Sequence, residues 1–273
     1  CPVARDAEIT LEANPDSACD VKALRALRRA GFNRISLGVQ SADDGLLRAI
    51  GRIHTFAQVQ EAVAAVRKAG FKNLSMDLIY GLPGQTMQQW EDTLAAVIAL
   101  APEHISCYGL KLEPGTPLYD CRDSECFPDD DAQADMYLYA VTVLAQNGYE
   151  QYEISNFAKP GYYARHNSSY WHDTPYIGVG AAAHSYDGKT RSWNTASLDD
   201  YISSIEEGIR PCEYETIDAE THYNDLITTA LRTREGLQLE HLSPKDRQFA
   251  LDAARLHIGR GLLAVDDDRL HLT

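Results

Sequence analysis

The sequence has little that would suit a membrane protein or a nucleic-acid-binding protein. No run of apolar residues approaches the ~18 that a membrane-spanning helix needs. Basic residues are scarce: 25 Lys and Arg stand against 40 Asp and Glu, for a net charge of −15. This excess of acid repels nucleic-acid phosphates and anionic lipids. We therefore expect neither nucleic acid nor stable membrane insertion among its interactions, and the sequence gives no oligomeric state.

The six cysteines have no regular spacing, and no two of them form a CxxC pair. A disulfide framework is therefore absent, and this cysteine usage is typical of the reducing cytoplasm, where we expect the protein to work. A chain of 273 residues can bury about three quarters of the surface that it exposes when unfolded, so it needs no disulfide or bound metal in order to fold. The sequence does not begin with methionine, and we expect further residues upstream of Cys1.

Strand and helix signals alternate through the first 110 residues, which predicts an α/β fold. Strands are expected at residues 8–12, 34–40, 74–79 and 105–110. Between them, a helix stops near Gly31, a second runs from an N-cap at Thr55 to Gly70, and a third follows a capping box at Thr86. Repeated strand–helix–strand units favour a parallel sheet with right-handed crossovers.

Alternate residues of the four strands form a small, polar set. One face of each strand is apolar, and the other carries Thr10, Glu12, Ser36, Gly38, Gln40, Ser75, Asp77, Ser106 and Tyr108. An ordinary parallel sheet is apolar on both faces, so this pattern indicates the interior of a (β/α) barrel, with ligands at the C-terminal ends of the strands. A solvated sheet face, or buried polar groups paired with backbone, is the alternative. Four strands cannot close a barrel, so we expect either missing strands before Cys1 or an open edge.

The rest of the chain has a different pattern. Residues 112–133 look like a connector, followed by a helix at 132–147, a strand at 149–154 and an irregular stretch up to Asn194. From residue 198 the pattern is helical and ends in a hairpin, which predicts a winged-helix-like module, although its fifteen acidic and eight basic residues between 200 and 273 argue against DNA binding. We predict three parts: a partial barrel at 1–115, an α+β region at 116–195 and a winged-helix-like domain at 196–273.

Several longer motifs resemble a known family. The segments LEANP (11–15), GFNRISLGVQS (31–41), IGRIHT (50–55), MDLIYGLPGQT (76–86) and PEHISCYGLKLEPGT (102–116) are similar to the radical S-adenosylmethionine family of oxygen-independent coproporphyrinogen III oxidases. Three later segments, QYEISNFAKPG (151–161), HNSSYW (166–171) and YIGVGAAAHSY (176–186), resemble more narrowly the HemW-type heme chaperones of that family. The resemblance implies a partial radical-SAM (β/α) barrel and covers nearly all of the chain, with a looser match over the final 70 residues.

The family carries two motifs that this sequence lacks. Its CxxxCxxC motif holds a [4Fe-4S] cluster, and a GGGTP motif follows the second barrel strand; neither occurs here. Cys121 and Cys126 have the wrong spacing for the cluster and come after the fourth strand. The resemblance therefore implies an N-terminally truncated chain that holds the cluster only together with the missing segment.

The resemblance implies which residues contact S-adenosylmethionine. These are Glu12, Gln40, Arg52, Asp77 and, less specifically, Lys111, with His54 as part of the wall beside them. Carboxylates suit ribose hydroxyls and an amino group, and a guanidinium suits the methionyl carboxylate. The alternative for Arg52 is that it binds no cosubstrate and is an ordinary solvent-exposed arginine at the end of a helix. The turn from Gly81 to Thr86 could face an anion or a ribose, or could simply cap the helix that follows.

The HNSSYW motif is implied to bind heme. His166 is the first candidate ligand for heme iron, and Tyr170 and Trp171 suit the porphyrin plane. The alternative interpretation of the motif is structural: His166 would be a buried histidine hydrogen-bonded to the backbone, and Tyr170 and Trp171 would be core residues. His172 and His184 are further candidate ligands of heme iron.

These features predict a heme chaperone that delivers heme to an acceptor hemoprotein and, when complete, also binds the cluster and S-adenosylmethionine. The alternative is the oxidase itself, which decarboxylates coproporphyrinogen III by radical chemistry. A third possibility is a partial chain without activity.

Overall fold

The computed structural model describes residues 3–123 and 126–273, so Cys1, where we expect the sequence to continue upstream, lies outside the described residues. Backbone contacts divide the chain into two compact units, which we call unit 1 (up to Ala164) and unit 2 (Arg165–Thr273). This division differs from the three parts predicted above. Residues 116–195 are split between the two units, because their first part adds two helices and two strands to the structure of unit 1.

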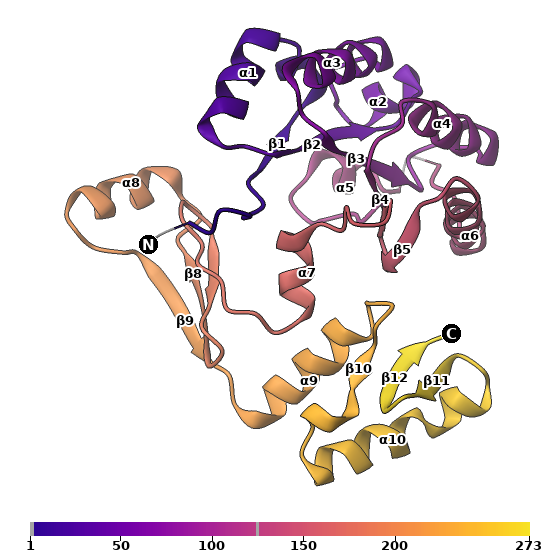
Figure 1. Cartoon of the computed structure of the whole chain (residues 1–273), viewed down its shortest axis with the longest axis vertical. Helices are drawn as coiled ribbons and strands as arrows, with labels where there is room; N and C mark the ends of the chain where they lie inside the picture. The colour runs from indigo at the N-terminus through magenta and orange to yellow at the C-terminus, as the bar shows by residue number, and fades with distance from the viewer. Residues whose placement is uncertain (1–2, 124–125) are drawn as a thin grey trace. The chain divides into compact units, whose positions relative to one another are not determined.

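Unit 1 is built on a six-stranded sheet with the order β1-β2-β3-β4-β6-β5 (Figure 1). Its first four strands pair in parallel, and β6 and β5 continue the sheet antiparallel. The predicted parallel α/β arrangement is therefore confirmed. The strands are β1 (Thr10–Ala13), β2 (Arg34–Gln40), β3 (Asn73–Tyr80), β4 (His104–Gly109), β5 (Glu150–Glu153) and β6 (Asn156–Ala158).

Helices connect these strands and cover the apolar face of the sheet. They are α1 (Val21–Ala30), α2 (Asp44–Ala49), α3 (Phe56–Ala69), α4 (Met87–Ala99), α5 (Pro117–Asp120) and α6 (Asp130–Gln146), with a 3-10 turn at Pro15–Ser17. The predicted helix starts are confirmed at Thr55 and Thr86, each of which forms a capping box with the glutamine three residues later. Gly31 ends α1 with φ 114°, a backbone conformation that side-chain-bearing residues rarely adopt.

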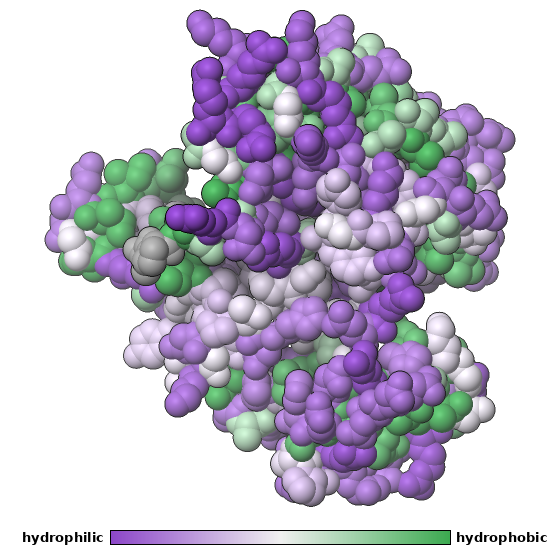
Figure 2. All heavy atoms as spheres, viewed as in Figure 1, coloured by the Kyte–Doolittle hydropathy of each residue, from purple (hydrophilic) through white to green (hydrophobic). Residues whose placement is uncertain are grey.

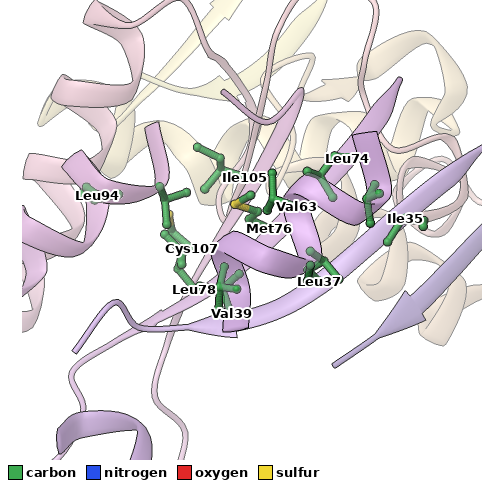
Figure 3. Close-up of a cluster of buried hydrophobic side chains, with 14 of the residues drawn as sticks. Ile35, Leu37, Val39, Val63, Leu74, Met76, Leu78, Leu94, Ile105 and Cys107 are labelled. Atoms are coloured by element: carbon green, nitrogen blue, oxygen red, sulfur yellow. The ribbon is translucent and has the colours of Figure 1, made fainter. Parts of the chain in front are cut away.

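The core of unit 1 lies between the sheet and the helices. Figure 3 shows the apolar side chains of β2, β3 and β4 gathered on the helix-facing side of the sheet together with Val63 of α3 and Leu94 of α4. Each fully buried side chain of this size contributes about 1.5–3 kcal/mol to the free energy of unfolding. The predicted apolar set of these three strands is confirmed: Ile35, Leu37, Val39, Leu74, Met76, Leu78, Ile105 and Cys107 are at most 1% exposed.

Unit 2 contains two three-stranded antiparallel sheets, ordered β7-β8-β9 and β10-β12-β11. The stretch before Asn194 is more regular than the sequence predicted, and a strand interrupts the region predicted to be helical. Its elements are α7 (Arg165–Trp171), β7 (His184–Tyr186), β8 (Thr190–Asn194), α8 (Leu198–Glu206), β9 (Cys212–Thr216), α9 (Ala219–Ala230), β10 (Leu237–Gln238), a 3-10 turn at Leu239–His241, α10 (Pro244–Gly259), β11 (Leu263–Asp266) and β12 (Arg269–Leu272).

The C-terminal part of unit 2 has the helix–strand–helix–hairpin order of a winged-helix-like module. Leu237, Leu239, Ala254 and Leu270 form its small core. Elsewhere in unit 2, α8 exposes apolar side chains: Leu198, Ile202 and Ile205 are 62%, 46% and 45% exposed, and green surface gathers over this helix in Figure 2.

Candidate functional site

The polar residues of unit 1 form two rows across one face of the sheet. Strand pairing sets Glu12 beside Ser36, Ser36 beside Ser75, and Ser75 beside His104. A second row, one step toward the C-terminal ends of β2 and β3, runs from Gly38 through Asp77 and Ser106 to Asn156. Side chains two residues apart on a strand share a face, so both rows lie on the face opposite the core.

Asp77 lies at the centre of these rows. The Ser36 hydroxyl donates to both carboxylate oxygens, at 3.2 and 3.1 Å, and the Ser75 hydroxyl donates to one at 3.5 Å. Burial raises the pKa of Asp77, the hydroxyls of Ser106 and Ser36 and the charge of Arg34 oppose that rise, and the charge of Glu12 adds to it. Two of the predicted cosubstrate residues, Glu12 and Asp77, are therefore close enough to influence each other electrostatically.

Gln40 and Arg52 form a second group at the end of β2. A bulge shifts the pairing between Gly38 and Gln40, and Gln40 itself has φ 65°. A Cβ atom on Gly38 would lie 2.9 Å from Gln40 Nε2 and 3.6 Å from Asn14 Oδ1, so the glycine leaves room for both side chains. Arg52 Nη1 donates to Asn14 Oδ1 at 3.2 Å. Asn14 was not singled out from the sequence, although it lies within the LEANP motif.

Three other sequence candidates lie apart from these groups. Lys111 is exposed and pairs with Glu113 at 2.6 Å. His54 is buried, and its Nε2 lies 3.2 Å from the Val39 carbonyl oxygen, so it supports the bulge at the end of β2. In the Gly81–Thr86 turn, the amide of Leu82 donates to Gln85 Oε1 and the amide of Gln85 donates to the Leu82 carbonyl, as expected of a turn that precedes a helix. The amide of Gly84 donates to the carbonyl of Cys126, in the segment between β4 and α6.

A chain of buried hydrogen bonds, which no sequence pattern predicted, extends from the first row. Ser75 Oγ lies 2.8 Å from His104 Nδ1, and His104 Nε2 lies 2.7 Å from the Tyr152 hydroxyl. His104 is 0% exposed, and burial lowers its pKa well below the usual value. The imidazole is therefore neutral, and one of its nitrogens must accept a hydrogen bond.

The HNSSYW motif of unit 2 forms the helix α7 rather than the irregular segment predicted from the sequence. His166 is exposed; its Nε2 lies 3.0 Å from the Tyr170 hydroxyl, and the two rings meet edge to face with centroids 5.0 Å apart. Residues four apart share a helix face, whereas Trp171 is rotated about 140° from His166. Trp171 instead stacks under the Arg232 guanidinium, 4.7 Å from the ring centroid.

The two further candidate ligands differ in their surroundings. His172 has Nδ1 2.6 Å from the Ser168 carbonyl oxygen and Nε2 2.9 Å from Glu235. Burial alone would lower its pKa, but the hydrogen bonds to Glu235 and Ser168 outweigh that effect and raise it. His184 is exposed on β7 and packs near the Trp193 ring, with centroids 6.2 Å apart.

The donor set of unit 1 fits S-adenosylmethionine better than it fits a metal cluster. Carboxylates, an amide and a guanidinium at the C-terminal ends of parallel strands provide the groups that a ribose and an amino-acid moiety require. Among residues 3–123 and 126–273, no group of three or more His, Cys, Asp or Glu is arranged to hold a metal ion. The described residues therefore do not form the site of a [4Fe-4S] cluster.

Comparison with known proteins identifies the superfamily to which the fold of this chain belongs. Residues 3–97 match the radical SAM superfamily. A solved structure of the coproporphyrinogen III oxidase HemN from Escherichia coli, described as a radical SAM enzyme, superposes with a TM-score of 0.82 over 98% of this chain and 66% of that chain, at 23% identity. The fold is thus that of a radical SAM protein, as predicted.

Curated relatives narrow the class to a family. The heme chaperone HemW of Lactococcus lactis subsp. lactis (strain IL1403) is 36% identical over 97% of this chain and 71% of its own length. That of Bacillus subtilis (strain 168) is 37% identical over 87% of this chain and 63% of its own length. The chain belongs to the HemW family, which confirms the resemblance seen in the sequence, and it spans about two thirds of the length of these relatives. In the part that the structure describes, no helix is long and apolar enough to cross a bilayer.

Proposed function

We propose that the complete protein is a heme chaperone that binds heme and passes it to an acceptor hemoprotein in the cytoplasm. The observation that carries this proposal is the exposed imidazole of His166, on the helix formed by HNSSYW, in a chain whose curated relatives are named heme chaperones. Imidazole is a common axial ligand of heme iron, and aromatic side chains suit the porphyrin plane.

In this proposal His166 ligates the iron, and Tyr170 and Trp171 contact the macrocycle. His166 Nε2 is within hydrogen-bond distance of the Tyr170 hydroxyl, so ligation through Nε2 requires that this hydroxyl move away. Because Tyr170 and Trp171 leave α7 in different directions, they would contact different parts of the bound porphyrin.

The polar face of unit 1 would hold S-adenosylmethionine. Glu12 and Asp77 would accept hydrogen bonds from ribose hydroxyls or the amino group, Arg52 would pair with the methionyl carboxylate, and Gln40 would bond through its amide. Lys111 remains a weaker candidate because it is exposed and paired with Glu113. Bound together with a [4Fe-4S] cluster, S-adenosylmethionine would supply one-electron chemistry.

The oxidase alternative has less support. The likeness to the solved oxidase, at 23% identity, concerns the fold alone, and the curated relatives quoted above are named chaperones. Conversion of coproporphyrinogen III to protoporphyrinogen IX by the full-length protein under anaerobic conditions would favour the oxidase over the chaperone.

A heme titration followed by the visible absorption spectrum tests the proposal on this chain. We expect His166→Ala to weaken heme binding and to change the Soret band, because an axial ligand is lost. His257→Ala removes another exposed helical histidine of unit 2 and should leave the titration unchanged. An identical titration curve for wild type and His166→Ala would refute the assignment of His166.

A further inference from the structure

Helix α8 of unit 2 exposes a row of apolar side chains to solvent. The row consists of Leu198, Ile202 and Ile205 of the helix and Ile209 just after it, which are 45% to 62% exposed. Their spacing of four, three and four residues places them on one side of the helix, and we call these four residues the α8 stripe. No residue of α8 is buried. The stripe is therefore an apolar surface that the described residues of unit 2 leave uncovered.

The helix lies in a loop between β8 and β9 (Figure 1) that is fixed at its base. The amide of Thr195 donates to the Pro211 carbonyl oxygen at 2.9 Å, which joins the two ends of this loop. The Tyr201 hydroxyl, on the side of α8 next to the stripe, accepts a hydrogen bond from the Gly180 amide at 3.1 Å. These contacts position the helix but leave the stripe free to contact another surface.

Helix α8 is too short to be stable without further contacts. It has nine residues, whereas isolated helices of fewer than about 12–15 residues are marginal in water, and helices in proteins are stabilised mainly by packing of their apolar face. Its start is capped by Ser197, which accepts from the Asp200 amide, and its end is followed by Gly208 with φ 79°. Because these caps leave the apolar face in water, a surface that buries the stripe would also stabilise the helix.

The charges around the stripe indicate the chemistry of that surface. Four exposed acids, Asp199, Asp200, Glu206 and Glu207, belong to this loop, and none of them forms an ion pair with a described residue. At about 100° per residue, Asp199 and Glu206 lie directly beside the stripe. The one basic residue between 195 and 211, Arg210, donates to side chains of β7 and β8 instead. The rim of the stripe is therefore acidic, and a surface that carries Lys or Arg beside apolar side chains complements it.

Size and charge argue against a second copy of the chain and against a membrane as the occupant. Residues 198–209 span about 18 Å along the helix and about 10 Å across it. Their area is roughly a few hundred Å², less than the ~800 Å² that each partner buries in a stable complex. Two copies would also bring their acidic rims together, and the same carboxylates would repel anionic lipids. A transient protein partner fits the stripe better.

We propose that the α8 stripe is a docking surface for a protein partner that presents apolar side chains edged by Lys or Arg. The partner buries the stripe, pairs with its acidic rim and, because the contact is small, dissociates again. The docking surface itself does not depend on heme. Its assignment to the acceptor hemoprotein, which a heme chaperone must contact briefly, rests on the proposed function.

A synthetic helical peptide, with leucine along one face and lysine at its other positions, is a suitable probe. Fluorescence anisotropy should show that the labelled peptide binds the chain and that added salt weakens binding. The double variant Ile202→Ser/Ile205→Ser removes half of the stripe without changing the charge, and should weaken binding about tenfold to hundredfold. Leu256→Ser is the matched control, since this side chain is 67% exposed on α10 of the same unit, and should leave the affinity unchanged. A peptide with glutamate in place of lysine should not bind.

Several results would overturn the proposal. Equal peptide binding by wild type and the double variant, or equal weakening by Leu256→Ser, would show that the stripe is not the docking surface. A Tm of the double variant lower by more than about 4 °C would show that the chain itself covers the stripe, as would binding by this chain that the complete protein lacks.

Two further measurements test the other occupants. A wild-type dimer in sedimentation equilibrium that the double variant disrupts would assign the stripe to a second copy of the chain. Binding to vesicles of phosphatidylcholine and phosphatidylglycerol that the double variant loses would assign it to a membrane. We expect neither result, because the acidic rim opposes both contacts. Since the peptide contains no heme, a failed heme titration would bear on the proposed function alone.

Discussion

Removal of the Tyr152 hydroxyl tests whether the buried hydrogen-bond chain of unit 1 has a fixed direction. Ser75 can only donate to the Asp77 carboxylate, at 3.5 Å, so its oxygen accepts from His104 Nδ1–H. His104 Nε2 must then accept from the Tyr152 hydroxyl, whose oxygen accepts from the Ala164 amide at 3.3 Å. Burial raises the pKa of Tyr152, so the phenol keeps its proton and can donate.

Tyr152→Phe keeps the ring and its stacking on Tyr163, with centroids 4.5 Å apart, but leaves His104 Nε2 buried without a donor. One buried group that loses its partner costs about 1–3 kcal/mol of the free energy of unfolding. In a domain of this size each kcal/mol lowers Tm by about 2–4 °C. Urea denaturation should therefore show a lower midpoint with an unchanged slope.

Two comparisons make this measurement specific. Tyr162→Phe removes, from a half-buried tyrosine, a hydroxyl that has no hydrogen-bond partner among the described residues, and should change stability by less than about 0.5 kcal/mol. In a His104→Leu background, Tyr152→Phe should cost much less than in wild type, because the two groups act as one pair. An equal cost in both backgrounds would refute the coupling, and a ¹⁵N NMR spectrum showing the Nε2–H tautomer of His104 would refute the direction.

Three further predictions concern pH, the cosubstrate and the backbone. Because burial lowers the pKa of His104, the unfolded chain binds a proton that the folded chain does not; the free energy of unfolding should fall below pH ~6.5 by up to about 1.4 kcal/mol per pH unit, and His104→Leu should flatten this slope in urea titrations. Because burial raises the pKa of Asp77, its ionised form destabilises the folded state above that pKa, so Asp77→Asn should keep or raise Tm at pH 7 while weakening S-adenosylmethionine binding in calorimetry; a lower Tm would contradict this. Gly178→Ala places a Cβ 2.1 Å from the His184 carbonyl oxygen and should cost about 1–3 kcal/mol. Gly259→Ala, in helix α10 with open space around it, should instead leave stability unchanged or raise it by up to about 1 kcal/mol in thermal denaturation.

The parallel half of unit 1 could be predicted from the sequence because its signals are local and repeated. Alternation in Ile35, Leu37 and Val39 directly reports which face of β2 meets the helices, and Thr55 and Thr86 mark helix starts by their own side-chain chemistry. The same alternation placed Glu12 and Asp77 on one face. The strand ends were predicted to within a few residues because the strands carry continuous patterns.

Other features depend on contacts that no local pattern records. Helix α7 has seven residues, too few to display a helical period, so the aromatic stretch around His166 looked irregular. Strand β6 has three residues and is defined by its pairing with β4 on one side and β5 on the other. The bulge between Gly38 and Gln40 arises from the pairing of β2 with β3. Lys111 is exposed because it lies beyond the end of β4.

The β5–β6 hairpin explains why the site cannot be understood from the parallel strands alone. It places Asn156 beside Ser106, whose hydroxyl donates to Asn156 Oδ1 at 2.6 Å, and it carries Tyr152 to His104. Ser106 is the strand neighbour of Asp77, and His104 bonds Ser75, which donates to Asp77, so the hairpin orders the polar residues next to this carboxylate. A carboxylate whose burial is opposed by ordered hydroxyls is held in one position. The antiparallel addition therefore belongs to the proposed cosubstrate site as much as the parallel strands that carry its charged residues.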